Sequence, residues 1–313
     1  MLKLIRNNKI ERKRFSWFFL LRLTGIVIFI IVILNVDLNA IWQNIKEVNP
    51  GYLALALLFQ IILLIVKGIR WHILNDGHKD KMAFFKSMGE FLESYAIGVI
   101  TPGRLGELLK AGYQKKKENI IGSSIRVLAE RGMDVGFFVF VAGSAVLWGN
   151  LIKIQPIWGI VILTSGVLIA GIAVLLISSS LIINWIEKLS KKLTIAKKER
   201  STREVFYIVL LALISNTAYF FSCYLLAVGI KIKMTFLFTS GGVAIAGLFN
   251  MLPITVMGMG TRELTFLYVF DEFQKTQILA LSGLIFLVAQ IGGGIISLLL
   301  GQLFLFINKK QKI

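Results

Sequence analysis

The segment P-G-R-L-G-E at residues 102–107 interrupts one apolar stretch of the chain, and P-I-T-V-M-G-M-G-T-R-E at residues 253–263 interrupts another. Each segment holds a proline, glycines, an arginine and a glutamate between two apolar pieces. Proline lacks an amide hydrogen and disfavours helix in the preceding residue, and glycine adopts backbone conformations that other residues avoid. Both segments therefore predict a break between two helices.

Long apolar blocks surround these breaks. Hydrophobic residues make up 56% of the 313 residues, and the mean hydropathy is +0.77. Five blocks approach or exceed the roughly 20 residues of a membrane span: 16–34, 51–66, 157–177, 205–230 and 277–307. Residues 133–149 form a further candidate span. We expect an all-α polytopic membrane protein with about six full transmembrane helices. The run at 15–34 is too long for a signal-peptide core, so we expect a retained first span.

Basic residues gather between the apolar blocks. The chain has 35 Lys and Arg against 17 Asp and Glu, a net charge of +18. Because cytoplasmic loops carry an excess of Lys and Arg, we expect a multi-pass protein of the inner (plasma) membrane with both termini in the cytoplasm. This pattern does not indicate nucleic-acid binding. The residues that we place at the cytoplasmic flanks of the first break include Lys67, Arg70, Lys79, Lys81, Lys86 and Lys110.

Residues 87–109 have cytoplasmic flanks on both sides, which predicts a re-entrant helical hairpin. If its arms were full spans, the number of spans would rise and both chain ends would stay in the cytoplasm. Residues 234–270 repeat the pattern from the outside. We therefore expect one domain over 1–313 with two re-entrant helical hairpins in an inverted repeat, halves at 15–150 and 157–307, and a cytoplasmic amphipathic connector at 181–203. Interrupted helices at matching positions of such halves point to a transporter site near the midplane.

Charged residues in and near the breaks are the candidate binding groups. A charge at membrane depth costs roughly 2.5–3.5 kcal/mol unless it is paired or faces water, and arginine's forked, permanent charge suits phosphate. Positions 126, 130 and 134 share one helix face. The candidate substrate-binding residues are Glu93, Pro102, Gly103, Arg104, Gly106, Glu107, Glu130, Arg131, Asp134, Pro253, Gly258, Gly260, Arg262 and Glu263.

A purely structural interpretation of the same charges stays open. In it, Arg104 pairs with Glu107 and Arg262 with Glu263 to hold a bent backbone. Glu93 could likewise pair with Arg104 or Arg131, or receive a proton or a cationic headgroup.

Metal, cofactor and catalytic signatures are absent from the sequence. The one cysteine, Cys223, offers neither a disulfide nor a thiolate zinc cluster, and His72 and His78 have no ligand at helical spacing. No phosphate-binding loop or nucleophile motif is present. We expect no metal, no cofactor and no enzymatic activity.

Gly68-Ile69-Arg70-Trp71, the P-G-R-x-G-E box, Glu130-Arg131-x-x-Asp134 and the P-x-x-x-x-G-x-G-x-R-E box together resemble the lysylphosphatidylglycerol synthase transmembrane family, also called flippase-like domain proteins. The resemblance covers most of the chain and implies transport of a membrane phospholipid or a polyprenyl-linked lipid. For protein partners, we expect either a second copy of the chain, in a homo-oligomer, or a glycosyltransferase. Because the sequence stops at Ile313, we expect no soluble synthase domain and no aminoacyl transfer.

The leading hypothesis is passive or ion-coupled translocation of an anionic or zwitterionic lipid. In it, Arg104 and Arg262 engage the phosphate from opposite sides, positioned by Glu107 and Glu263. One alternative is a membrane-embedded accessory protein or an enzyme of lipid-linked glycan or phospholipid metabolism that uses carboxylates such as Glu130. A second alternative is a small-solute transporter.

Cysteine labelling in a Cys223→Ser background tests the predicted topology. Single cysteines near Gly103 should react with a membrane-impermeant reagent from the cytoplasmic side of sealed vesicles, and those near Gly258 from the outside. Inaccessibility of both tips from either side would favour the purely structural interpretation.

Overall fold

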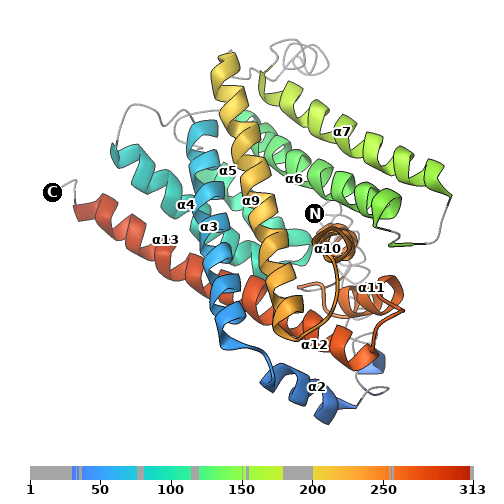
Figure 1. Ribbon diagram of the computed structural model, residues 1–313. Helices are drawn as coiled ribbons and strands as arrows, with labels where there is room; N and C mark the ends of the chain where they lie inside the picture. Colours follow the sequence, from blue (N-terminus) through green and yellow to red (C-terminus); the bar gives the residue numbers. More distant parts are fainter. Residues whose placement is uncertain are drawn as a thin grey trace, which may run out of the picture.

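The computed structural model describes residues 30–32, 34, 37–75, 81–113, 120–149, 151–152, 155–178, 200–253, 255 and 257–310, and its regular structure there is entirely helical (Figure 1). The described helices that are long and apolar enough to cross a membrane are α3 (Pro50–Leu74), α6 (Ile120–Trp148), α7 (Pro156–Ser178), α9 (Thr202–Gly229) and the joined α12 (Lys275–Ile285), η3 (Phe286–Gly292) and α13 (Gly293–Lys310). The all-α polytopic architecture is confirmed. The predicted first span and most of the 181–203 connector lie outside the described residues.

The first predicted break separates α4 (Lys81–Ile100) from η1 (Pro102–Leu108) and α5 (Leu109–Tyr113). The chain reverses there: a Cβ on Gly106 would lie only 2.7 Å from the carbonyl carbon of Ile97, so the two arms are in direct contact. Gly103 and Arg104 have positive φ angles, 59° and 54°. Positive φ at glycine carries little steric cost, and this explains how the chain turns so tightly.

The second break separates α10 (Phe236–Met251) from α11 (Thr261–Val269), which lie against each other. Gly258 and Gly260 have φ angles of 72° and 85°. Helix, break and helix are therefore present in both segments. Their re-entrant placement in a membrane stays a prediction.

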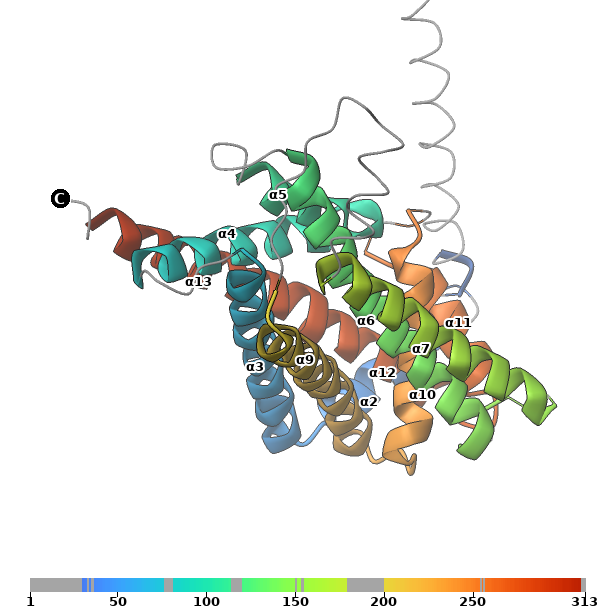
Figure 2. The same cartoon turned by 90° about the horizontal axis from the view of Figure 1, so that it is seen from above.

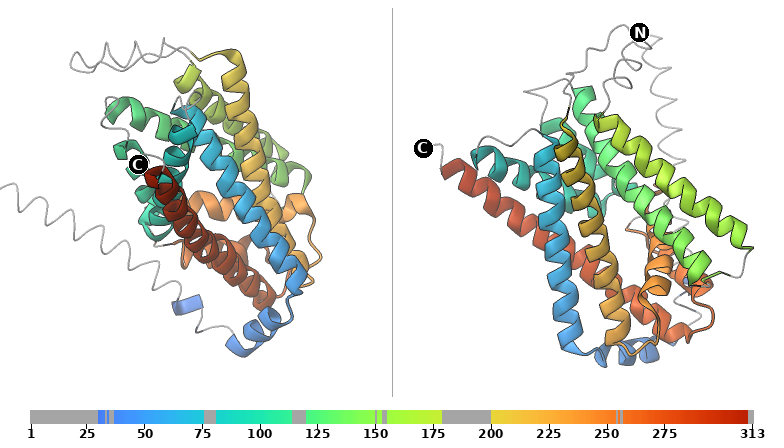
Figure 3. Two further views of the ribbon diagram at one scale, coloured as in Figure 1. Left: turned by 90° about the vertical axis from the view of Figure 1, so that its left-hand side faces the viewer. Right: turned by 45° about the horizontal axis from the view of Figure 1, so that its top comes forward.

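The long helices form two pairs: α3 lies along α9, and α6 along α7 (Figure 1; Figure 3, right). In addition, α4 packs along α13 and α10 along α6, and Figure 2 shows α4 and α13 running together to one side of the molecule. The first helix of each hairpin thus packs on the last long helix of the other predicted half. An inverted repeat would give this exchange, although the repeat itself stays a prediction.

The two hairpin tips meet near the centre of the bundle. A Cβ on Gly103 would lie 3.0 Å from the carbonyl oxygen of Met251 and 3.3 Å from the Cα of Pro253. Outside this centre, large apolar side chains cover much of the surface, for example Leu168 on α7, Phe206 on α9 and Leu299 on α13. A polar centre with an apolar exterior suits a protein surrounded by lipid.

The short helix α2 (Leu38–Lys46) precedes α3 in the chain and packs against α12. The Asp37 side chain caps its N-terminus by accepting from the amide of Asn39 at 2.9 Å. None of its residues is buried, and Trp42 is exposed. An amphipathic helix with an exposed tryptophan suits the membrane interface.

Glycines let α6 and α7 approach closely. A Cβ on Gly143 would lie 2.5 Å from the backbone nitrogen of Leu163, and a Cβ on Gly166 would lie 2.5 Å from that of Phe140. Small residues at helix interfaces allow this contact in membranes, where packing rather than the hydrophobic effect joins helices.

Substituting alanine for glycine raises helix propensity at any helical position, so its effect on stability shows whether close packing at that position matters more. We expect Gly143→Ala to lower stability by about 1–3 kcal/mol, because the new methyl group overlaps the α7 backbone. Gly171→Ala is the matched control, because its Cβ would meet no atom within 4 Å. Thermal unfolding in detergent measures both, and equal melting temperatures would contradict the close approach.

Candidate functional site

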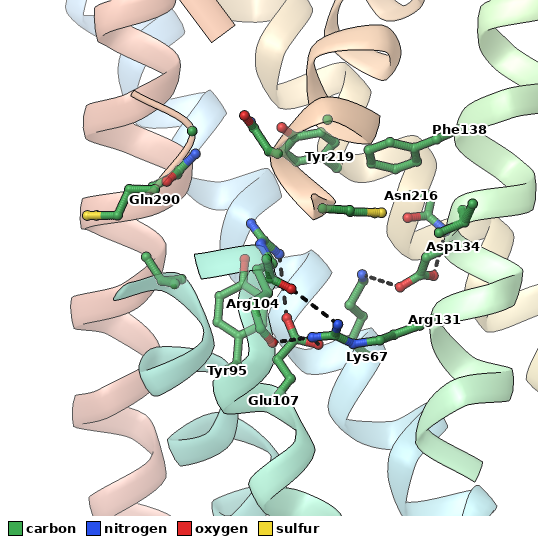
Figure 4. A pocket seen from close by; sticks show the side chains of 18 of the residues that line it. Lys67, Tyr95, Arg104, Glu107, Arg131, Asp134, Phe138, Asn216, Tyr219 and Gln290 are labelled. Carbon is green, nitrogen blue, oxygen red and sulfur yellow. Dashed lines mark hydrogen bonds and ion pairs between the residues drawn. The ribbon is translucent and has the colours of Figure 1, made fainter. Parts of the chain in front are cut away.

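A cavity of about 290 Å³ lies where the two tips meet (Figure 4). Helices from both predicted halves contribute to it: α3, α4, η1, α6, α9, α10 and η3. Its polar and charged lining residues are Lys67, Tyr95, Thr101, Arg104, Glu107, Arg131, Asp134, Asn216, Tyr219, Asn250 and Gln290. Gln290 belongs to the π-helical stretch η3, a local widening that is frequent at functional sites.

The cavity brings together some of the residues proposed from sequence. Those that line it are Gly103, Arg104, Glu107, Arg131, Asp134 and Gly258. The remaining candidates, Glu93, Pro102, Gly106, Glu130, Pro253, Gly260, Arg262 and Glu263, are not among the lining residues. Sequence reasoning missed Lys67, Asn216 and Tyr219, which α3 and α9 contribute.

Arg104 occupies the first tip in an unusual backbone conformation. Its φ angle of 54° is uncommon for a residue other than glycine, and such conformations concentrate at ligand-binding sites. The guanidinium lies 5.4 Å from the ring centroid of Tyr95 and 3.7 Å from the Glu107 carboxylate. With 31% of its side chain exposed, Arg104 keeps part of its donor surface open to the cavity.

Arg131 fastens the first tip to α6. It donates to the backbone carbonyl oxygens of Gly103, at 3.3 Å, and of Arg104. Its guanidinium also lies 3.6 Å from the Glu107 carboxylate (Figure 4). Glu107 therefore lies between two arginines, and the charged face of α6 contacts the first hairpin.

Behind the cavity, two α6 carboxylates form a buried ion-pair network with α3 and α5. Arg70 reaches Asp134 at 2.8 Å and Glu130 at 3.0 Å. Lys67 lies 2.7 Å from Asp134, and Lys110 pairs with Glu130. From α9, Asn216 donates to Asp134 at 2.9 Å and also to the carbonyl oxygen of Ala212. Four helices are thus joined through two carboxylates.

The sequence indicated basic flanks at Lys67, Arg70 and Lys110 but not that these cations are paired inside the helix bundle, and their cytoplasmic placement stays a prediction. The predicted span at 51–66 continues to Leu74, and the Arg70 side chain is fully buried. The α6 carboxylates pair with these cations, so no charge of the group is left buried without a partner, the arrangement that destabilises most. Lys110 also lies 4.8 Å from the Trp71 ring centroid. The signal available in the sequence was the match between cations three apart on α3 and carboxylates four apart on α6.

Of the alternatives left open for Glu93, the pairing with Arg104 or Arg131 is not present. Glu93 instead accepts from Gln302 at 2.8 Å and from the Tyr113 hydroxyl at 3.3 Å. Glu93 precedes the cavity residue Tyr95 by two positions, which turns it about 200° around α4. Its side chain therefore faces α13 and α5.

At the second tip, Gly258 lines the cavity, but Arg262 and Glu263 do not and contact α12 instead. Arg262 is buried and pairs with Glu263, and its Nε donates to Ser282 Oγ at 2.8 Å. Glu263 accepts from the Gly260 amide at 2.7 Å, which caps α11. The geometry therefore does not support Arg262 as the partner of Arg104 across a bound phosphate, but it agrees with a role in holding the tip.

The charges that line the cavity favour an anion. Three are cations, Lys67, Arg104 and Arg131, and two are carboxylates, Glu107 and Asp134, which leaves one positive charge in excess. Asp134 is satisfied by Arg70 and Asn216 without Lys67. An incoming anion can therefore bind Lys67 without leaving Asp134 unpaired.

These features define a polytopic membrane protein with a cationic internal cavity formed at two broken helices. The chain matches the family described as lysylphosphatidylglycerol synthase TM region over residues 19–297, and it belongs to this family. No curated protein matches it.

A double-mutant comparison tests the buried network. Glu130→Leu leaves the buried charge of Lys110 without its carboxylate partner, so we expect it to lower the free energy of unfolding by about 3–5 kcal/mol. Lys110→Met combined with Glu130→Leu removes both charges and should recover much of that loss, as measured by thermal unfolding in detergent. A double variant no more stable than Glu130→Leu would contradict the pairing.

Proposed function

We propose that this protein moves a phosphate-bearing lipid, or a lipid-linked substrate, between the leaflets of the membrane. In this proposal the phosphate binds in the central cavity to Lys67, Arg104 and Arg131. The observation that carries it is the excess of cations in a cavity formed where two broken helices meet. Ionised donors make the strongest hydrogen bonds to phosphate oxygens, and Arg104 and Arg131 supply forked ones.

The position of the cavity supports transport. It is lined by both hairpins and by the long helices α3, α6 and α9, so opposite rocking of the two halves would change the side from which it is reached. Glycines at the tips, Gly103 and Gly258, would allow the backbone to follow such a movement. In this proposal both hairpins are re-entrant, and both termini lie in the cytoplasm.

Transport fits the carboxylates better than catalysis does. Glu130 is compensated by Arg70 and Lys110, and Glu93 lies outside the cavity. Glu107 and Asp134 remain, and both already face cations: Glu107 lies beside Arg104 and Arg131, and Asp134 pairs with Lys67 and Arg70. They suit the cationic part of a zwitterionic headgroup. The same charges could bind a small anionic solute, but the family's description, which names a phospholipid synthase, favours a lipid as the substrate.

Movement of a fluorescent phosphatidylglycerol in proteoliposomes tests the proposal. A membrane-impermeant quencher reports the fraction that has crossed. Lys67→Met should slow crossing by about tenfold or more, the effect of losing one charge-assisted hydrogen bond worth roughly 1.5–3 kcal/mol. The fold should survive, because Asp134 keeps Arg70 and Asn216.

Lys46→Met is the matched control, because Lys46 is exposed on α2 and does not line the cavity. Lipid should cross at the wild-type rate in vesicles that contain this variant. Wild-type crossing by Lys67→Met, or wild-type protein no faster than protein-free vesicles, would contradict the proposal.

A further inference from the structure

A second cavity, of about 360 Å³, lies between α6, α7 and α9 and is lined almost entirely by apolar atoms. Several of its lining residues are small, among them Gly136, Gly166 and Gly171. A Cβ on Gly171 would meet no atom within 4 Å, so the space beside it is open. We call this cavity the apolar groove.

The apolar groove opens toward the hydrocarbon that surrounds the protein. Its lining residues Val167, on α7, and Leu213, on α9, are 54% and 44% exposed, and Phe140 on α6 is also exposed. Because α9 packs along α3 and α7 along α6, the groove lies at the seam between the two helix pairs (Figure 1). A hydrocarbon chain could enter it from the side.

The groove and the charged cavity share their walls. On α6, Met133 and Phe137 line the groove, and the next residue after each, Asp134 and Phe138, lines the cavity. On α9, Ala212 lines the groove one turn before Asn216, which lines the cavity. Asn216 bridges the two, since it donates to the Ala212 carbonyl oxygen and to Asp134, each at 2.9 Å.

We propose that the apolar groove binds a hydrocarbon chain of the same lipid whose phosphate occupies the charged cavity. This inference rests on the proposed function and specifies its substrate as a lipid that enters laterally between α7 and α9. Because residues next to each other on α6, and one turn apart on α9, line the cavity and the groove, the groove is the apolar space beside a phosphate bound to Lys67. A water-soluble phosphate would leave the groove unused.

Photolabelling identifies the occupant. Wild-type protein in lipid vesicles is mixed with phosphatidylglycerol that carries a diazirine at the end of one acyl chain, irradiated, and digested for mass spectrometry. We expect labelled peptides from α7 and α9 around Val167 and Leu213. Gly171→Trp should remove this labelling and slow lipid crossing, because the indole fills the groove without meeting the α6 backbone.

Ile172→Trp is the matched control. Ile172 is exposed on α7 and does not line the groove, so the same bulk there should leave labelling and crossing at wild-type levels. Lys67→Met should also lose the label, because the chain follows its headgroup. A diacylglycerol with the same diazirine, which lacks phosphate, should not label the groove.

Two results would overturn the inference. Labelling that persists in Lys67→Met, or that diacylglycerol reproduces, would mean that ambient lipid fills the groove. Crossing that depends on Lys67 without any label in the groove would overturn the inference and leave the proposed function standing. Wild-type labelling that depends on Lys67, in protein that moves no lipid, would support the binding mode and overturn the proposed function.

Discussion

The pairing of Asp134 and Glu130 with Arg70 is the interaction on which the rest of the structure depends. These groups are nearly or fully buried, and each unpaired charge at such a position would cost several kcal/mol. Together with Lys67, Lys110 and Asn216 they join α3, α5, α6 and α9. This arrangement fixes the first hairpin against α6, and Arg131 on the same helix then holds the tip. The cavity has its shape because the helices around it are held by charge.

The same network separates structural cations from those that can meet a ligand. Arg70 and Lys110 are enclosed and paired with the α6 carboxylates, whereas Lys67 and Arg104 reach the cavity and retain exposed surface. Asp134 connects the two groups, because it contacts Arg70 on one side and Lys67 on the other. A bound phosphate would compete with Asp134 for Lys67 and would therefore act on the helices that Asp134 joins. Substrate binding and helix arrangement are linked through one carboxylate.

The sequence was sufficient for the helical architecture and for both breaks, because proline, glycine and apolar length act locally. It was insufficient where burial depends on a distant partner. Charge counting indicated only that Lys67 and Arg70 flank a span, because their partners on α6 lie sixty or more residues away in the sequence. The two tips were treated as equivalent because both contain proline, glycine, arginine and glutamate. Arg262 instead faces Ser282 on α12, a neighbour that tertiary packing supplies.

A density map of the protein in phosphatidylglycerol nanodiscs, obtained by electron cryo-microscopy, tests the central claim most directly. The account predicts a phosphate within hydrogen-bond distance of Lys67 and Arg104 in the cavity between the tips. Lipid found only on the outer surface, with Lys67 still paired to Asp134 and the cavity filled by water or side chains, would contradict it.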